Sequence, residues 1–170
     1  MHDVDVAVLG GGPVGLYAAY YAGFRGLSVA VIDALGEIGG QVTSLYPEKE
    51  IHDVAGFRAI RGADLVQALA EQAAQFQPLF LLGRQAIGYD RTDDCHLVTL
   101  QDGTVVRSRA VLMCAGLGSM EPKPLPAARG WDGEGLVYSV QQLSVLDGRD
   151  VVVVGGGDSA VDWANAAHGR

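Results

Sequence analysis

The sequence predicts an α/β fold with a mainly parallel sheet. Two glycine-rich turns are the main evidence: GGGPVG at residues 10–15 and GGGDSA at residues 155–160 each follow a short apolar run. Between them, further apolar runs alternate with helical stretches, which is typical of βαβ units. Because a glycine turn between a strand and a helix suits phosphate binding, we expect one nucleotide-binding domain and the start of a second.

The composition narrows the classes of protein to which this chain can belong. A hydrophobic fraction of 49% in 170 residues suffices for a packed core, and a net charge of −8 argues against nucleic acid or an anionic membrane as partner. The sequence carries no signal-peptide pattern and no apolar run that could span a bilayer, so we expect a cytoplasmic protein. Cys95 and Cys114 form no CxxC pair, and the histidines lack metal-ligand spacing, so we expect no metal site.

The expected elements of the first domain follow the chain in order. Buried strands are predicted at residues 4–9, 28–32, 79–82 and 110–114, helices at 14–24 and 63–76, and a long functional loop at 34–61. Short alternating strands at 85–89, 96–101 and 104–107 form a meander, with a hairpin turn at Asp102-Gly103. Such a meander often covers one face of a nucleotide-binding sheet, so the expected domain has three layers (ββα).

Residues 116–135 are rich in proline and glycine and indicate a boundary. We therefore expect a nucleotide-binding domain at residues 1–117, and a linker with the beginning of a second, truncated domain at 118–170. In that second part, a strand at 151–154 and a helix at 158–167 flank the GGGDSA turn.

The first turn has the residue pattern of a dinucleotide site. Gly10 permits the tight turn, Gly12 lets the backbone approach a pyrophosphate, and Gly15 lets the helix pack on the strand. Asp33 ends the second strand, about 20 residues further on, where a carboxylate accepts hydrogen bonds from ribose hydroxyls. A carboxylate there repels a 2′-phosphate, so we expect FAD or NAD and not NADP at this turn. A plain acid at a strand end is the alternative for Asp33.

Two longer stretches resemble one family. GGQVTSLYPEKEIHDVAGF at residues 39–57 is similar to the flavin loop of the thioredoxin-reductase-like ferredoxin–NADP reductases, and GGGDSAVDWA at 155–164 is similar to the NADP-domain turn of that family. The resemblance runs from about Asp3 to Ala167, and the family's chains are considerably longer. It implies an FAD-binding Rossmann-like domain followed by an NADP-binding domain.

The resemblance also implies residue roles around FAD. Asp33 would hold the adenosine ribose, Gln41 the flavin end, and Tyr46 would stack on the isoalloxazine ring. Ala86 would meet adenine through backbone groups, and Met120 would line the flavin pocket. From the residues alone, Gln41 also fits an exposed loop amide, Tyr46 a loop anchor and Met120 a linker filler.

One position departs from the family, and the second turn is incomplete. Val14 stands where the family often has Thr, which removes one hydroxyl contact to phosphate but leaves the backbone N–H. Gly155, Gly157 and Ser159 would cradle the pyrophosphate of a nicotinamide nucleotide, or form a turn with no ligand. Preference for NADP(H) follows from the resemblance alone, because the strand end that selects it is not in this chain.

The function implied is that of a ferredoxin–NADP reductase, with hydride transfer between NADP(H) and FAD and single-electron exchange with ferredoxin or flavodoxin. We expect no essential acid–base residue in this segment, and a homodimer in the full-length protein. Thioredoxin reductase is disfavoured, because residues 138–145 (YSVQQLSV) hold no cysteine where that family has CxxC. There are two alternatives: a truncated flavin-binding fragment without turnover, and another two-dinucleotide flavoprotein reductase.

Overall fold

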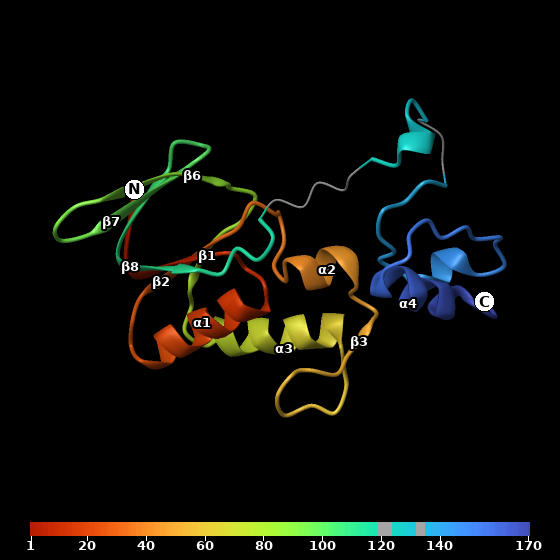
Figure 1. Cartoon of the computed structure of the whole chain (residues 1–170). Coiled ribbons are helices and arrows are strands. Elements are labelled where there is room, and N and C mark those ends of the chain that lie inside the picture. Colours follow the sequence, from red (N-terminus) through yellow and green to blue (C-terminus); the bar gives the residue numbers. More distant parts are fainter. Residues whose placement is uncertain (119–123, 132–134) are drawn as a thin grey trace.

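A six-stranded sheet with helices on one face dominates the structure, a computed structural model that describes residues 1–118, 124–131 and 135–170 (Figure 1). The strand order is β5-β2-β1-β8-β7-β6. Strands β5, β2, β1 and β8 run parallel, whereas β7 and β6 continue the sheet in antiparallel pairing. This arrangement confirms the predicted α/β class.

Apart from β8, the bounds of the strands in this sheet agree with the sequence-based expectation to within two residues. The strands are β1 (His2–Leu9), β2 (Val29–Ile32), β5 (Leu79–Leu81), β6 (Ala86–Arg91), β7 (His96–Leu100) and β8 (Val105–Met113). The predicted separate strands 104–107 and 110–114 are in fact one strand. Residues 105–108 of β8 pair with β7, and residues 106–113 pair with β1 on the other edge. β8 therefore joins the meander to the parallel sheet.

Helices α1 (Pro13–Phe24) and α3 (Gly62–Ala74) pack side by side against one face of the sheet (Figure 1). Alternate strand residues point to that face, so Val6 and Val8 of β1 are buried together with Ala19 of α1 and Ala73 of α3. The two helices approach closely because Gly23 has no side chain: a Cβ there would lie 2.4 Å from the Cβ of Phe76.

Helix α1 begins and ends at residues suited to those positions. Pro13 occupies its first turn, where the missing N–H has no intrahelical partner in any case. At the other end Gly26 adopts a positive φ of 79°. Its N–H donates to the Gly23 carbonyl at 2.8 Å, and the Leu27 N–H donates to the Ala22 carbonyl at 3.1 Å. These paired bonds form a Schellman motif, which ends the helix and returns the chain to β2.

Although its strands continue the hydrogen-bonded sheet, the meander bends back over the face of the parallel strands that lies opposite the helices. Ala7 and Ile32, from the parallel strands, share one buried cluster with Val98, Leu100 and Val106 from β7 and β8. Helices, parallel sheet and meander therefore form three layers, as the sequence predicts. Because β1, β2 and β8 run parallel, their carboxyl ends lie at one common edge of the sheet.

The long loop predicted at 34–61 contains regular structure. A short helix, α2 (Gln41–Leu45), follows Gly40, and a two-stranded ribbon forms from β3 (Glu50–Ile51) and β4 (Ile60–Arg61). These elements escaped the sequence analysis because each is only one turn or two residues long and has no periodicity.

The C-terminal part differs most from expectation. It contains two 3₁₀ turns, η1 (Pro126–Ala128) and η2 (Leu143–Leu146), and helix α4 (Asp158–Ala167). The strand predicted at 151–154 is wrong: these valines adopt no strand and are 38–87% exposed. A parallel strand is stabilised by its neighbours' hydrogen bonds, and no described residue pairs with this segment.

Candidate functional site

The turn between β1 and α1 depends on two glycines for steric reasons. Gly10 has a φ of 109°, and a Cβ at this position would lie 2.3 Å from the carbonyl oxygen of Cys114 in the neighbouring strand end. A Cβ at Gly15 would lie 1.8 Å from the Gly10 carbonyl oxygen. The helix therefore starts directly against the strand it follows, as predicted from the sequence.

Gly12 has a different environment. Its φ is −71°, which any residue adopts, and a Cβ there would meet no atom closer than 3.9 Å. It is the N-cap of α1, and no side chain caps the helix. The first-turn N–H groups, including that of Val14, lack intrahelical acceptors, so the helix presents uncapped donors and a partial positive charge. This arrangement fits an anionic group such as a pyrophosphate.

Asp33, at the end of β2, is tied to this turn. Its Oδ2 accepts a hydrogen bond from the Gly11 N–H at 2.6 Å, and its Oδ1 accepts one from the Leu35 N–H at 2.8 Å. Each carboxylate oxygen has a further lone pair, so both remain able to accept a hydroxyl. The link between Asp33 and Gly11 was not expected from the sequence, because it depends on the tertiary approach of two strand ends.

Gln41 and Tyr46 lie at the two ends of α2. The backbone enters this helix through Gly39 and Gly40, with φ of 104° and 55°, and the Gly39 N–H donates to the Gly11 carbonyl at 2.8 Å. The side chain of Gln41 extends towards the other strand end: a Cβ at Gly116 would lie 2.7 Å from Nε2 of Gln41. The loop thereby folds over the glycine turn.

A cavity of about 250 Å³ lies between these segments. Six predicted site residues line it: Gly10, Gly12, Val14, Asp33, Gln41 and Tyr46. The sequence analysis missed further lining residues, namely Pro13, Leu35, Gly40, Val42, Cys114, Ala115, Gly116 and Gly118. The last four follow β8, and the carboxyl end of that strand was the available clue, since ligands of open α/β sheets bind at that edge.

The Cys114 thiol is part of this wall and is not ionised. Burial raises the pKa of Cys114 above its ordinary value. A neutral thiol is a poor nucleophile and a small apolar surface, so Cys114 contributes packing to the cavity.

The other predicted residues lie outside this cavity. Gly15 is buried behind the turn, and Ala86 lines a separate groove of about 630 Å³ beside β6 and β8. Met120 lies outside the described residues. Gly155, with a φ of 140°, and the N-cap Gly157 precede α4, and Ser159 lines a cleft between α4 and the segment around α2.

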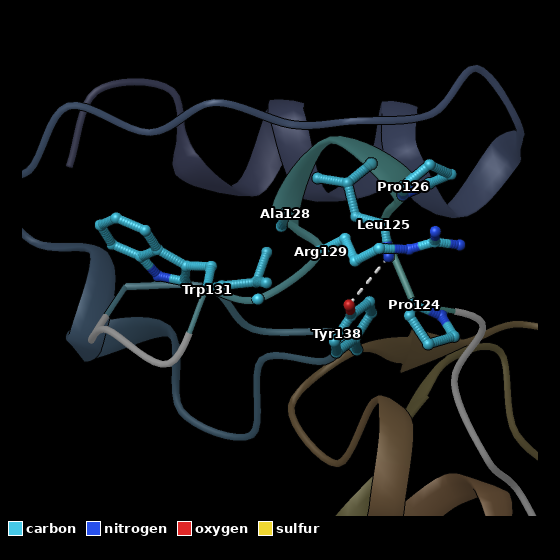
Figure 2. Close-up of a pocket in the computed structure, with 9 residues that line it drawn as sticks. Pro124, Leu125, Pro126, Ala128, Arg129, Trp131 and Tyr138 are labelled. Carbon is cyan, nitrogen blue, oxygen red and sulfur yellow. Dashed lines mark hydrogen bonds between the residues drawn. The ribbon is translucent and has the colours of Figure 1, made fainter.

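A further hollow of about 700 Å³ is lined by residues between 124 and 131, together with Leu136 and Tyr138 (Figure 2). Trp131 and Arg129 line it, and the Leu125 N–H donates to the Tyr138 hydroxyl at 3.0 Å. None of the predicted site residues that the structure describes contributes to it, so it is not part of the nucleotide cavity.

Neither a membrane span nor a metal cluster is found in the described part of the chain. No helix there has the length and apolar character needed to cross a bilayer. No group of three or more His, Cys, Asp or Glu side chains among residues 1–118, 124–131 and 135–170 has metal-binding geometry.

Residues 4–170 match the family described as pyridine nucleotide-disulphide oxidoreductase. The chain belongs to this family. Two curated relatives, both named ferredoxin–NADP reductase, come from Saccharopolyspora erythraea and Thermus thermophilus; they are 57% and 46% identical over 166 and 162 residues. The matches cover 98% and 94% of this chain but 51% and 48% of the relatives. The resemblance found in the sequence is thus confirmed, and the chain spans about half the length of these relatives.

Solved structures show the fold alone. A thioredoxin reductase from Streptococcus pyogenes has a TM-score of 0.61 at 24% identity, covering 73% of this chain and 38% of its own. A thioredoxin reductase from Gloeobacter violaceus has a TM-score of 0.57 at 24% identity, covering 98% of this chain and 54% of its own. These matches confirm the α/β fold with its mainly parallel sheet.

Proposed function

We propose that this chain forms the FAD site of a ferredoxin–NADP reductase. The observation that carries the proposal is the cavity at the carboxyl edge of the sheet. It gathers an uncapped helix start, a strand-end carboxylate, an amide and a phenol, and these groups suit the pyrophosphate, the ribose and the ring system of FAD. The relatives named ferredoxin–NADP reductase support the choice of reaction.

The polar end of FAD would be held by the first turn. The N–H groups of the α1 start, with Val14 among them, would donate to the pyrophosphate, and Gly10 and Gly12 would let it approach the backbone. Gly15 would act indirectly, by keeping the helix close to the strand. Asp33 would use its remaining lone pairs to accept hydrogen bonds from ribose hydroxyls.

The remaining contacts extend along the cofactor in two directions. Gln41 and Tyr46 would meet the flavin end, where Tyr46 would stack on the isoalloxazine ring and Gln41 would donate through its amide. Met120 would line the same pocket. Ala86 would approach adenine through its backbone. Arg84, two residues earlier, donates its backbone N–H to the Asp33 carbonyl at 3.0 Å, and this contact with the proposed ribose ligand supports the placement.

The bound cofactor would supply hydride exchange with NADP(H) and single-electron exchange with ferredoxin or flavodoxin. The protein residues would bind and orient it, and no side chain of this segment would act as acid or base. Gly155, Gly157 and Ser159 would bind the pyrophosphate of NADP(H). We propose a cytoplasmic homodimer for the longer protein, and domain bounds of 1–117 and 118–170.

A second function has an observation in its favour. Residues 151–154, which should support the second turn, are exposed and form no strand. A chain of this length would then act as a flavin-binding module without turnover. Reduction of its bound flavin by NADPH separates the two alternatives.

The test is the visible absorbance of the purified chain, incubated with FAD and desalted. We expect a retained, shifted flavin spectrum for the natural sequence. Gly12→Ala should lose most of the bound flavin while it keeps its fold, because its new Cβ would meet no protein atom closer than 3.9 Å and Gly12 lines the cavity. Gly36→Ala is the matched control, since its Cβ would meet no atom within 4 Å and Gly36 does not line the cavity.

Equal flavin retention by Gly12→Ala and the natural chain would contradict the assignment of the pyrophosphate site. A colourless natural chain with a folded sheet would contradict FAD binding by this segment. Circular dichroism of each variant verifies the fold in both cases.

A further inference from the structure

Two polar contacts connect α4 and η2 to the segment that follows α2. The Lys49 ammonium pairs with the Asp162 carboxylate on α4, and the Leu143 N–H donates to Oε2 of Glu48 at 2.7 Å. We call these four residues the clasp. They join segments that are about a hundred positions apart in the sequence. Glu48 and Lys49 are neighbours in the chain, and the elements they contact, η2 and α4, lie in contact with each other.

The clasp lies beside a cleft of about 590 Å³ whose walls come from both sides. Gln41 and Tyr46 form one wall, and Ser159 and Trp163 of α4 belong to the other. Gln41 and Tyr46 also line the 250 Å³ nucleotide cavity. These two residues therefore stand between the proposed flavin site and the second turn.

The clasp is suited to reversible opening. Lys49 and Asp162 have side chains 43% and 47% exposed, and exposed ion pairs are weak and screened by salt. Helix α4 has 10 residues and none is buried. A helix this short is marginal in water on its own, so its stability depends on what it docks against.

We propose that Glu48 and Lys49 are positioning residues that hold the second nucleotide-binding unit against the flavin loop. When the clasp is closed, Ser159 and Trp163 face Tyr46 across one cleft. The assignment of ligands to the two sides rests on the proposed function, but the clasp itself does not.

The experiment is hydrogen exchange of the chain without added nucleotide, followed on peptides that cover residues 158–167. Lys49→Glu and Asp162→Lys should each speed exchange in α4 about fivefold, the factor that corresponds to about 1 kcal/mol. The double variant restores an ion pair of opposite polarity, and its exchange should return to within about twofold of the natural chain. Glu48→Ala should also accelerate exchange, and Glu48→Gln, which keeps an acceptor oxygen, should do so less.

Arg84→Glu is the matched control. Arg84 pairs with Asp102 within the first unit, so its reversal should leave exchange in α4 unchanged. Unchanged exchange in Lys49→Glu, or a double variant that exchanges as fast as the singles, would overturn the clasp.

A second measurement separates this inference from the proposed function. In a Trp131→Phe background, Trp163 is the one remaining tryptophan. Titration with FAD should quench its emission, less so in Lys49→Glu, and the charge-reversed pair should recover the quenching. If no FAD binds at all, the proposed function fails, and the exchange experiment still decides whether the clasp exists. If FAD binds and the quenching is the same in every variant, the positioning role fails.

Discussion

At the scale of single residues, the three glycines of the first turn have different physical reasons to be glycine. Gly10 needs its positive φ, Gly15 needs the close contact with the Gly10 carbonyl, and Gly12 needs neither. At Gly12 the protein itself leaves room for a side chain, so the proposed ligand is what we expect a methyl group there to disturb. The same turn therefore contains two positions that need glycine for folding and one position proposed for binding.

Gly15→Ala should lower the free energy of unfolding by about 1–3 kcal/mol, because the new Cβ overlaps the Gly10 carbonyl and the helix must shift away. Gly12→Ala should change it by less than about 0.5 kcal/mol, since its methyl group has room. Urea unfolding of the chain without FAD measures both. Equal stability of the two variants would show that α1 does not start against the strand as described.

Asp33 combines a structural role with a proposed binding role. Its carboxylate accepts hydrogen bonds from the Gly11 and Leu35 N–H groups, which fixes the turn, and Asp33 also lines the cavity. A loss of flavin on substitution of Asp33 would thus have two causes. Gly12 is the better probe of binding for that reason.

At the scale of elements, a polar bridge joins the middle of β1 to Ser28, the residue before β2. Oδ2 of Asp5 accepts hydrogen bonds from the Ser28 N–H at 2.9 Å and the Ser28 hydroxyl at 2.8 Å. These bonds hold the pKa of Asp5 below its ordinary value, with a smaller contribution from Arg109. A lowered pKa in the folded state means that the ionised form adds stability above the unfolded pKa.

That stability should be lost as the pH falls below about 4 and through the lowered folded pKa. Asp5→Asn should therefore be less stable than the natural chain at neutral pH, and the difference should shrink as both are acidified. Urea unfolding midpoints measured from neutral pH down to about 3 test this. A difference that stays constant with pH would mean that the bridge is not formed by the ionised carboxylate.

Elements with strong local signals were predictable from the sequence, and those fixed by tertiary pairing were not. β1, α1 and α3 follow from apolar runs, Pro13 and helical periodicity. The union of two predicted strands into β8 depends on pairing with β1 and β7 on opposite sides, which no local pattern encodes. In the site, the fingerprint spacing predicted Gly10, Gly12 and Asp33, whereas the contribution of Gly116 required the two strand ends to meet.

At the scale of the whole molecule, burial is concentrated in the first unit. The three buried clusters of the described residues, with the residues packed on them, lie between Val4 and Cys114. The valine run at 151–154, by contrast, is as apolar as β2 but exposed. Sequence alone predicted a strand in both places. The difference is that β2 has β1 and β5 on either side, and apolar residues form a parallel strand only when such neighbours exist.

The two valine-rich runs should therefore behave differently in hydrogen exchange on the intact chain. Amides of β2 should exchange only through global unfolding, because they are buried and bonded on both edges. Amides of 151–154 should exchange close to the unprotected rate, because they have no ladder partner among the described residues. Mass spectrometry of peptides covering 29–32 and 151–154 makes the comparison within one sample. Protection of both runs to the same degree would show that the second unit forms its own sheet in solution, and the alternative of a flavin-binding module without turnover would lose its support.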